Sequence, residues 1–249
     1  SRSRYTGQIQ ITSEDDLMDF EKKRLERMAE YNNENYGDAW RAYNASINQK
    51  YHGRINADEA DLLEALEDPE VDAISVATPN HWHSLMTIWA AQAGKHVYVE
   101  KPMSHDVEEG RVAVAAQKKY GVVIQHGTQR RSSAEIAGLH EMIKAGTWGK
   151  LKIAYGYCCK PRGGIGTKGA SSPPENLDWD IWKGPAVIDD YHGNYVHYNW
   201  HWFWNWGTGE TCNNATHEVD VARWALGCGF PSRVTSAAAR HRYNDDWEA

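Results

Sequence analysis

Three side chains of this sequence have the chemistry for proton transfer, namely Lys101, Asn213 and His217. Lys101 follows an apolar segment and precedes Pro102, and a proline holds the residue before it in an extended backbone. A lysine held in this way can direct its ammonium group into a cleft, where it would assist the transfer of a proton. The alternative interpretation of Lys101 is a surface lysine in a turn.

The imidazole of His217 gains and loses a proton near neutral pH, which suits a general acid or base. His217 follows Asn213 by four residues, and residues four apart in a helix share one face. The spacing therefore predicts an amide and an imidazole side by side. Asp220 would orient the imidazole or pair with Arg223. The alternative is a helix histidine whose hydrogen bonds are satisfied by a neighbour.

The elements that position Lys101 are predicted by residues 71–102, which read VDAISVATPNHWHSLMTIWAAQAGKHVYVEKP. An apolar run breaks at Thr78-Pro79-Asn80, apolar residues then recur at helical spacing, and Gly94 suits the end of a helix. Val97 and Val99 form a second apolar run. Two buried strands joined by a helix indicate a parallel sheet, in which ligands bind beyond the carboxyl ends of the strands. Thr78-Pro79-Asn80 and Glu100-Lys101-Pro102 should therefore lie side by side.

Further along the chain, periodicity and breaker residues predict the remaining elements. We expect a helix from Ser13, helices over 58–66, 107–120, 134–145 and 211–226, strands over 122–125 (buried), 151–159 and 234–238, and a loop over 161–176. A domain boundary is expected near residues 127–133. Twelve tryptophans are many for a chain of this size, and they predict either a filled core or an aromatic wall for a sugar or another ring.

Composition excludes several classes of function. The chain has 249 residues, of which 41% are hydrophobic and 24% charged, as in soluble globular proteins. The formal charge of 27 − 34 = −7 disfavours nucleic acid as a partner. The absence of a long apolar run predicts no membrane span, and the compartment, cytoplasmic or periplasmic, stays open. Four cysteines make no disulfide framework, and His81 with His83 lack a third ligand, so we expect no metal.

The chain also resembles the Gfo/Idh/MocA family of NAD(P)-dependent oxidoreductases. The resemblance spans roughly residues 60–248 and rests on five segments in the family's order: ATPNHWHS (77–84), AGKHVYVEKP (93–102), GVVIQHGTQRR (121–131), LDWDIWKGPA (177–186) and NWHWFWNWGTGETCNNATHEVDVARWALG (199–227). One short motif would be weak, but five ordered segments are specific.

The resemblance implies an α/β fold, with an incomplete Rossmann-like parallel sheet over residues 1–129 and an α+β domain with an open sheet over 130–249. It implies NAD or NADP as cofactor, a sugar or cyclitol as substrate, and a homo-oligomer. It implies catalytic roles for Lys101, Asn213 and His217. The implied cofactor-binding residues are Thr78, Pro79, Asn80, His83, Glu100, Lys101, Gln129 and Trp182.

The sequence departs from the family's pattern in two places. The family's Asp-x-Gly-x-His becomes Asn213-x-Ala215-x-His217, and an amide can bind a substrate but cannot hold a charge. The N-terminal part also contains no G-x-G-x-x-G, the turn from which helix amides hold a diphosphate. Gly164, Gly166 and Gly169 have that spacing, but the prolines that follow cannot begin the required helix promptly.

These departures leave alternatives to a dehydrogenase. We expect that both ends of a longer protein are missing from this sequence, and that this chain alone binds NAD weakly. One alternative is a glycoside hydrolase or lyase that uses NAD in a cycle of oxidation, elimination and reduction. The other is a truncated scaffold that catalyses nothing.

Overall fold

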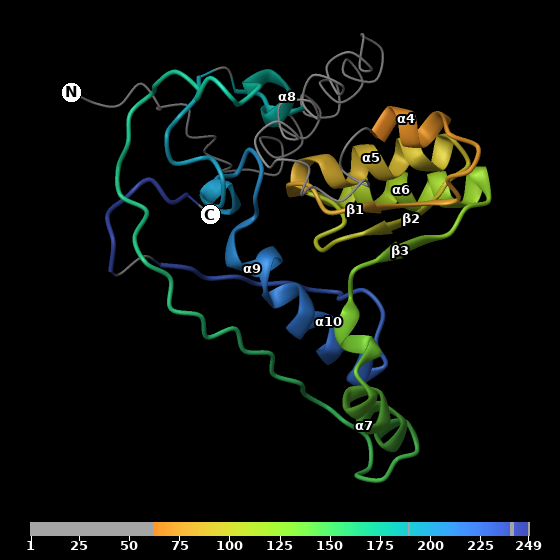
Figure 1. Ribbon diagram of the computed structural model, residues 1–249. Helices are drawn as coiled ribbons and strands as arrows, with labels where there is room; N and C mark the ends of the chain where they lie inside the picture. The colour runs from red at the N-terminus through yellow and green to blue at the C-terminus, as the bar shows by residue number, and fades with distance from the viewer. Residues whose placement is uncertain (1–61, 189, 240–241, 249) are drawn as a thin grey trace.

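The computed structural model describes residues 62–188, 190–239 and 242–248 (Figure 1). The elements of this part are, in order, α4 (Leu62–Glu67), β1 (Ala73–Val76), α5 (Asn80–Gln92), β2 (His96–Val99), α6 (Val107–Tyr120), β3 (Ile124–His126), η1 (Gln129–Ser132), α7 (Ala134–Lys144), α8 (Trp179–Lys183), η2 (Asn199–Trp202), α9 (Gly209–Asn213) and α10 (Ala215–Leu226). The helix predicted from Ser13 lies outside the described residues. Among the described helices, none is long and apolar enough to cross a bilayer.

The three strands form one parallel sheet in the order β1-β2-β3, as the apolar runs predicted. Val76 pairs with Val99, and Val99 pairs with His126, so the three strands end together. In Figure 1 the helices α5 and α6 lie on one side of the strands. Burial alternates along β1 and β2, so one face of each predicted strand is buried, through Ile74 and Val76 in β1 and Val97 and Val99 in β2, and the other face is exposed.

The helix ends follow the local signals in the sequence. The predicted helix over 107–120 is confirmed as α6, whose first turn is capped by Asp106 through a 2.8 Å bond from the Glu109 amide. The helix ends at Gly121, which adopts the left-handed conformation that glycine tolerates (φ 69°) and whose amide donates to the Gln117 carbonyl. α5 ends at Gln92, and the left-handed glycine follows two residues later, at Gly94 (φ 76°).

Other predicted elements differ from the structure. The third strand begins at Ile124, two residues later than expected, and its residues are only partly buried. Residues 151–159 and 234–238 belong to no strand, because apolar content makes a strand only where a neighbouring chain offers a hydrogen-bonding edge. In the described part after residue 133, strand-like pairing is limited to one isolated antiparallel bridge between Ala170 and His192.

The helix predicted over 211–226 is two helices. Asn214, with φ −122° and ψ −42°, departs from helical geometry and separates α9 from α10. Asn213 therefore closes one helix and His217 lies in the first turn of the next. The prediction that they share one helix face was wrong, although the break leaves both near the same point.

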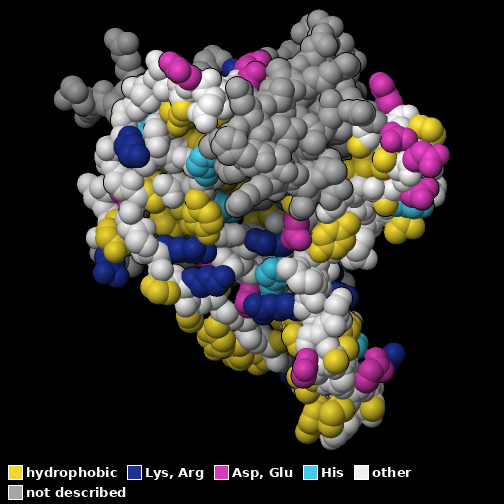
Figure 2. Space-filling view, viewed as in Figure 1, with side chains coloured by type: hydrophobic (Ala, Val, Ile, Leu, Met, Phe, Trp, Pro, Cys, Tyr) yellow, Lys and Arg dark blue, Asp and Glu magenta, His cyan; other side chains and the backbone are white. Residues whose placement is uncertain are grey.

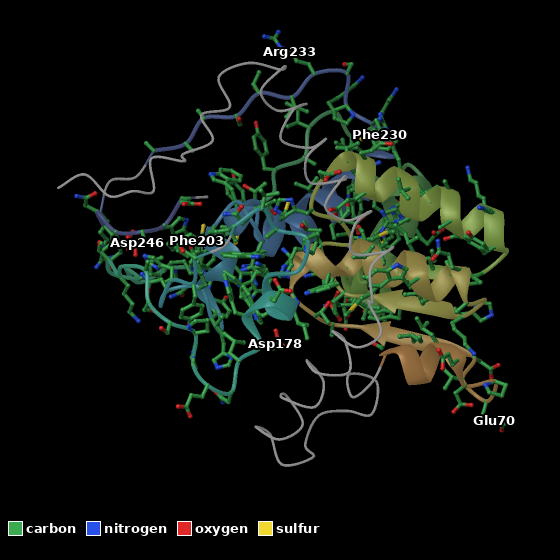
Figure 3. The ribbon with its side chains drawn as sticks, turned by 90° about the horizontal axis from the view of Figure 1, so that it is seen from above. Glu70, Asp178, Phe203, Phe230, Arg233 and Asp246 are labelled. Carbon is green, nitrogen blue, oxygen red and sulfur yellow. The ribbon has the colours of Figure 1, made fainter. Side chains whose placement is uncertain are left out.

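The core is largely aromatic. Trp82 and Trp89 of α5 pack with the buried rings of Trp182, Trp200 and Trp206, which come from the second half of the chain. These contacts join α5 to α8 and to residues 195–206, so core filling accounts for most of the tryptophans within the described ranges. Seen from above in Figure 3, Glu70 at the start of the sheet lies far from Asp178, Phe203 and Asp246, and the strands therefore end toward the aromatic half.

Candidate active site

Lys101 lies immediately beyond the carboxyl end of β2. The amide of Glu100 donates to the Val76 carbonyl (2.8 Å), and the amide of Lys101 donates to the Glu100 carboxylate (3.3 Å). The peptide bond that follows, Lys101–Pro102, is cis. The Lys101 side chain is half-buried, and this burial lowers the pKa of its ammonium group, an effect that Glu100 opposes and Lys160 strengthens. Glu100 thus accepts a hydrogen bond from the Lys101 main-chain amide and also stabilises the positive charge of the Lys101 side chain.

The ammonium group of Lys101 reaches a residue that is 112 positions later in the chain. Its Nζ donates to the side-chain oxygen of Asn213 (2.9 Å) and also to the Asn213 main-chain carbonyl. Asn213 is buried, and its amide nitrogen Nδ2 has no hydrogen-bond partner among the described residues. A buried donor of this kind is costly unless a ligand satisfies it, so Asn213 presents an N–H group suited to a substrate oxygen.

His217 lies close enough to Lys101 for the ammonium charge to affect its imidazole. Burial lowers the pKa of its imidazole, and the positive charges of Lys101 and Arg130 lower it further against the opposing effect of Glu218 and Glu100. Its Nδ1 is buried and has no hydrogen-bond partner within the described ranges. A lowered pKa keeps the imidazole neutral at neutral pH, which is the state that can accept a proton.

The helix that carries His217 is held by two arginines of η1. Arg130 pairs with Glu218 (2.7 Å), and Arg131 binds both carboxylate oxygens of Asp220 (2.7 and 2.8 Å). Asp220 therefore pairs with neither of its expected partners, because a bidentate arginine from another element outcompetes a residue on its own helix. These two ion pairs set the position of α10 relative to the end of the sheet.

The predicted cofactor-binding residues occupy different environments. Thr78 and Pro79 follow β1, and Asn80 begins α5, so these residues and Lys101 lie at one edge of the sheet as predicted. Gln129 is exposed in η1. Trp182 is buried in the core, where its ring lies 5.5 Å from that of Trp179, so packing explains it and we propose no cofactor contact for its ring.

His83 is also buried, with each ring nitrogen against a main-chain carbonyl, Pro102 at 2.7 Å and Thr78 at 2.6 Å. Its ring nitrogens are engaged by the protein, and this argues against the cofactor contact that the resemblance implied. The residues that carry such contacts in our proposal are therefore Thr78, Pro79, Asn80, Glu100, Lys101 and the exposed Gln129.

A dinucleotide fits this edge at one end only. The half-buried ammonium group, the buried amide of Asn213 and the loops after β1 and β2 suit the redox ring and its ribose. The described residues contain no glycine-rich turn that opens a helix, and Gly164, Gly166 and Gly169 lie in a loop, as predicted. The described part therefore lacks a cradle for the diphosphate.

Sequence reasoning missed several residues near the site. His126 ends β3 just as Lys101 follows β2, and its Nε2 is buried with no partner among the described residues. The strand-end rule that selected Lys101 would also have selected His126. Arg162 binds both oxygens of Glu210 (2.9 and 3.0 Å) across 48 residues, and no local signal in the sequence indicates that pair. Figure 2, which has the same view as Figure 1, shows Lys, Arg and His side chains gathered in a band across the middle of the molecule.

The repulsion between Lys101 and His217 makes a direct prediction. Replacing Lys101 with methionine removes a positive charge that disfavours imidazolium, so the pKa of His217 should rise toward its ordinary value. A proton NMR titration of the histidine ring signals would measure the change. Lys168→Met is the matched control, since the Lys168 ammonium group bonds to the Gly193 carbonyl instead. An unchanged His217 titration in Lys101→Met would show that the two groups do not interact.

Comparisons with known proteins indicate the family to which the chain is similar. A family model described as "Oxidoreductase family, NAD-binding Rossmann fold" matches residues 16–128, and one described as "Oxidoreductase family, C-terminal alpha/beta domain" matches residues 162–245. The chain is 41% identical over 90 residues to scyllo-inositol 2-dehydrogenase (NAD(+)) of Bacillus subtilis, which covers 36% of this chain and 26% of that protein.

Two longer matches have lower identity. Levoglucosan dehydrogenase of Pseudarthrobacter phenanthrenivorans is 27% identical over 168 residues, which are 68% of this chain and 36% of the relative. A crystal structure of the WlbA dehydrogenase from Bordetella pertussis, in complex with NADH and UDP-GlcNAcA, is 27% identical with a TM-score of 0.46 and covers 67% of this chain and 40% of that one. This chain thus spans well under half the length of each of these relatives.

Proposed function

Because the chain belongs to the Gfo/Idh/MocA oxidoreductase family, we propose that the protein is an NAD-dependent dehydrogenase that oxidises a hydroxyl group of a sugar or cyclitol. The observation that carries this proposal is the contact of Lys101 with Asn213 at the carboxyl edge of a parallel sheet, where burial and the Lys101 charge lower the pKa of His217. The inositol and levoglucosan dehydrogenases among the relatives support the class of substrate.

Each group has a separate task in this proposal. Bound NAD supplies the acceptor for the hydride that leaves the carbinol carbon. His217 accepts the hydroxyl proton, and the Lys101 ammonium group donates a hydrogen bond to the oxygen, which stabilises the negative charge that develops there. The free N–H of Asn213 positions the substrate. Thr78, Pro79, Asn80 and Glu100 border the cofactor.

The same proposal divides the chain into two parts. Residues 1–129 would contribute the cofactor-binding domain, and residues 130–249 the domain for substrate binding and self-association. The family models support this division, because one ends at residue 128 and the other begins at residue 162. η1, which follows β3 directly, would be the connection between the parts.

The test is to mix the chain with millimolar NAD and a panel of inositols and sugars, and to follow NADH formation. A dehydrogenase produces NADH in proportion to the substrate consumed. A redox-elimination hydrolase or lyase consumes substrate without net NADH, and a scaffold does neither. In parallel, energy transfer from tryptophan to added NADH measures binding, for which we expect a Kd weaker than micromolar because the described part lacks a diphosphate cradle. Tight binding would contradict that expectation.

A further inference from the structure

His83 connects the two loops that form the edge of the candidate site. It lies in the first turns of α5 and is only 1% exposed. Its Nδ1 is 2.7 Å from the carbonyl oxygen of Pro102, in the loop after β2, and its Nε2 is 2.6 Å from that of Thr78, in the loop after β1. One buried ring thus contacts both loops, on opposite sides.

The chemistry of imidazole limits how both contacts can be made. A neutral ring has one N–H group and one lone pair, whereas both partners here are carbonyl oxygens, which only accept. The neutral ring therefore holds one loop by a hydrogen bond, and imidazolium holds both. Burial lowers the pKa of His83, and the carbonyls of Pro102 and Thr78 oppose this effect. The charged and titratable groups that face the ring are Glu100, which favours the proton, and His126, which disfavours it.

The contact with Pro102 bears directly on Lys101. On one side of Lys101, the Glu100 amide is bonded to the Val76 carbonyl. On the other side, the carbonyl of Pro102 lies against His83. The next residue of α5 adds a weaker connection, because the hydroxyl of Ser84 donates to the Met103 carbonyl (3.1 Å). The backbone that presents the ammonium group is thus held from the sheet on one side and from α5 on the other.

We propose that His83 is a positioning residue for Lys101: its imidazole fills the space between the Thr78 and Pro102 carbonyls, hydrogen-bonds to one of them, and keeps the ammonium group half-buried against Asn213. Only the effect of His83 on catalysis rests on the proposed function. The geometry itself involves no cofactor or substrate. His83 acts on the reaction through Lys101 and does not touch the reacting atoms.

His81 provides a matched control within the same helix. It is as deeply buried as His83, but its Nε2 contacts the carbonyl of Trp182 (2.8 Å), in the aromatic core and not in either loop. Replacing either histidine with phenylalanine keeps a ring and removes a polar contact from the interior. Both substitutions should lower stability, and only the one at position 83 should change Lys101.

The experiment measures the pKa of Lys101 by competitive acylation of lysines at a series of pH values, with mass spectrometry of the peptides. In His83→Phe the loop loosens, the ammonium group gains water, and the pKa of Lys101 should rise toward its ordinary value. The unprotonated fraction at neutral pH then falls about tenfold for each unit of that rise. In His83→Gln the side-chain amide can donate to one of the two carbonyls, so the pKa of Lys101 should rise less than in His83→Phe. His81→Phe should leave Lys101 unchanged.

The outcomes separate this inference from the proposed function. Unchanged Lys101 profiles in folded His83→Phe and His83→Gln would overturn the positioning role, whatever the activity. If His83→Phe does not fold, the Gln variant and the wild-type NMR spectrum decide: a His83 ring with no slowly exchanging N–H proton would also overturn it. If Lys101 responds but no NAD-linked oxidation is found, the positioning role stands and the dehydrogenase proposal fails. In an active form, kcat should fall more than KM rises.

Discussion

Replacing Lys101 with methionine is expected to lower kcat about 10²- to 10³-fold in any form of the protein that turns over, the range typical of a lost hydrogen-bond donor to an oxygen that gains negative charge. Methionine has nearly the same length and no charge, so the side chain can still fill its half-buried place. It cannot bond to Asn213 or to a substrate oxygen. Initial rates of NADH formation at saturating substrate would measure the effect.

Two further variants sharpen this prediction. Lys101→Arg keeps the positive charge and can still donate to a substrate oxygen, so its kcat should recover in part. A kcat as low as that of Lys101→Met would contradict the assignment of charge stabilisation to Lys101. Lys168→Met, at an exposed lysine away from the sheet edge, should keep wild-type activity. Wild-type turnover in folded Lys101→Met would exclude the catalytic role.

Replacing Trp206 with alanine is expected to lower the free energy of unfolding by about 3–5 kcal/mol, the usual cost of removing a large aromatic side chain from a core. Trp206 is 0% exposed, and its indole N–H donates to the Lys183 carbonyl (3.2 Å). Its ring lies 4.4 Å from that of Tyr195 and 5.1 Å from that of Trp182. The substitution therefore leaves a cavity and removes the indole hydrogen bond to the Lys183 carbonyl, which keeps its bond from the Ala186 amide. Urea unfolding followed by circular dichroism would measure the loss.

The control lies two residues earlier in the chain. Trp204 is 51% exposed, so Trp204→Ala should change stability by about 0.5 kcal/mol or less, as surface substitutions usually do. Its main-chain amide, which donates to Glu248, is unaffected by the change. Equal losses in the two variants would show that the aromatic cluster does not stabilise the fold as its burial implies.

The aromatic cluster also reaches the candidate site. Trp202 stacks on Trp247 with ring centroids 4.0 Å apart, and the guanidinium of Arg162 lies 5.2 Å from the Trp202 ring. Arg162 in turn binds the carboxylate of Glu210, which belongs to α9, the helix that ends at Asn213. The partner of Lys101 is thus connected to the core through an arginine and a carboxylate.

Local sequence patterns were sufficient to predict the strands and helices that place Lys101. The strands at 73–76 and 96–99, the helix between them and the helix over 107–120 follow from apolar spacing, an Asp cap and well-placed glycines, all of which act within a few residues. Because parallel strands end at one edge, the sequence also predicted that the loops of Asn80 and Lys101 lie together. The contact of His83 with both loops agrees with that prediction.

Only the tertiary structure decided which distant groups meet. The capture of Asp220 by Arg131 and the pairing of Arg162 with Glu210 each depend on a partner tens of residues away. The break at Asn214 was also not predicted from the sequence. The segments over 151–159 and 234–238 have strand-like composition, but a strand also needs an edge to pair with. Steric restrictions and helix capping depend on residues that are neighbours in the sequence, so the sequence alone predicts them. Which of several possible polar partners a side chain binds depends on how distant elements pack, and that packing is a property of the whole fold.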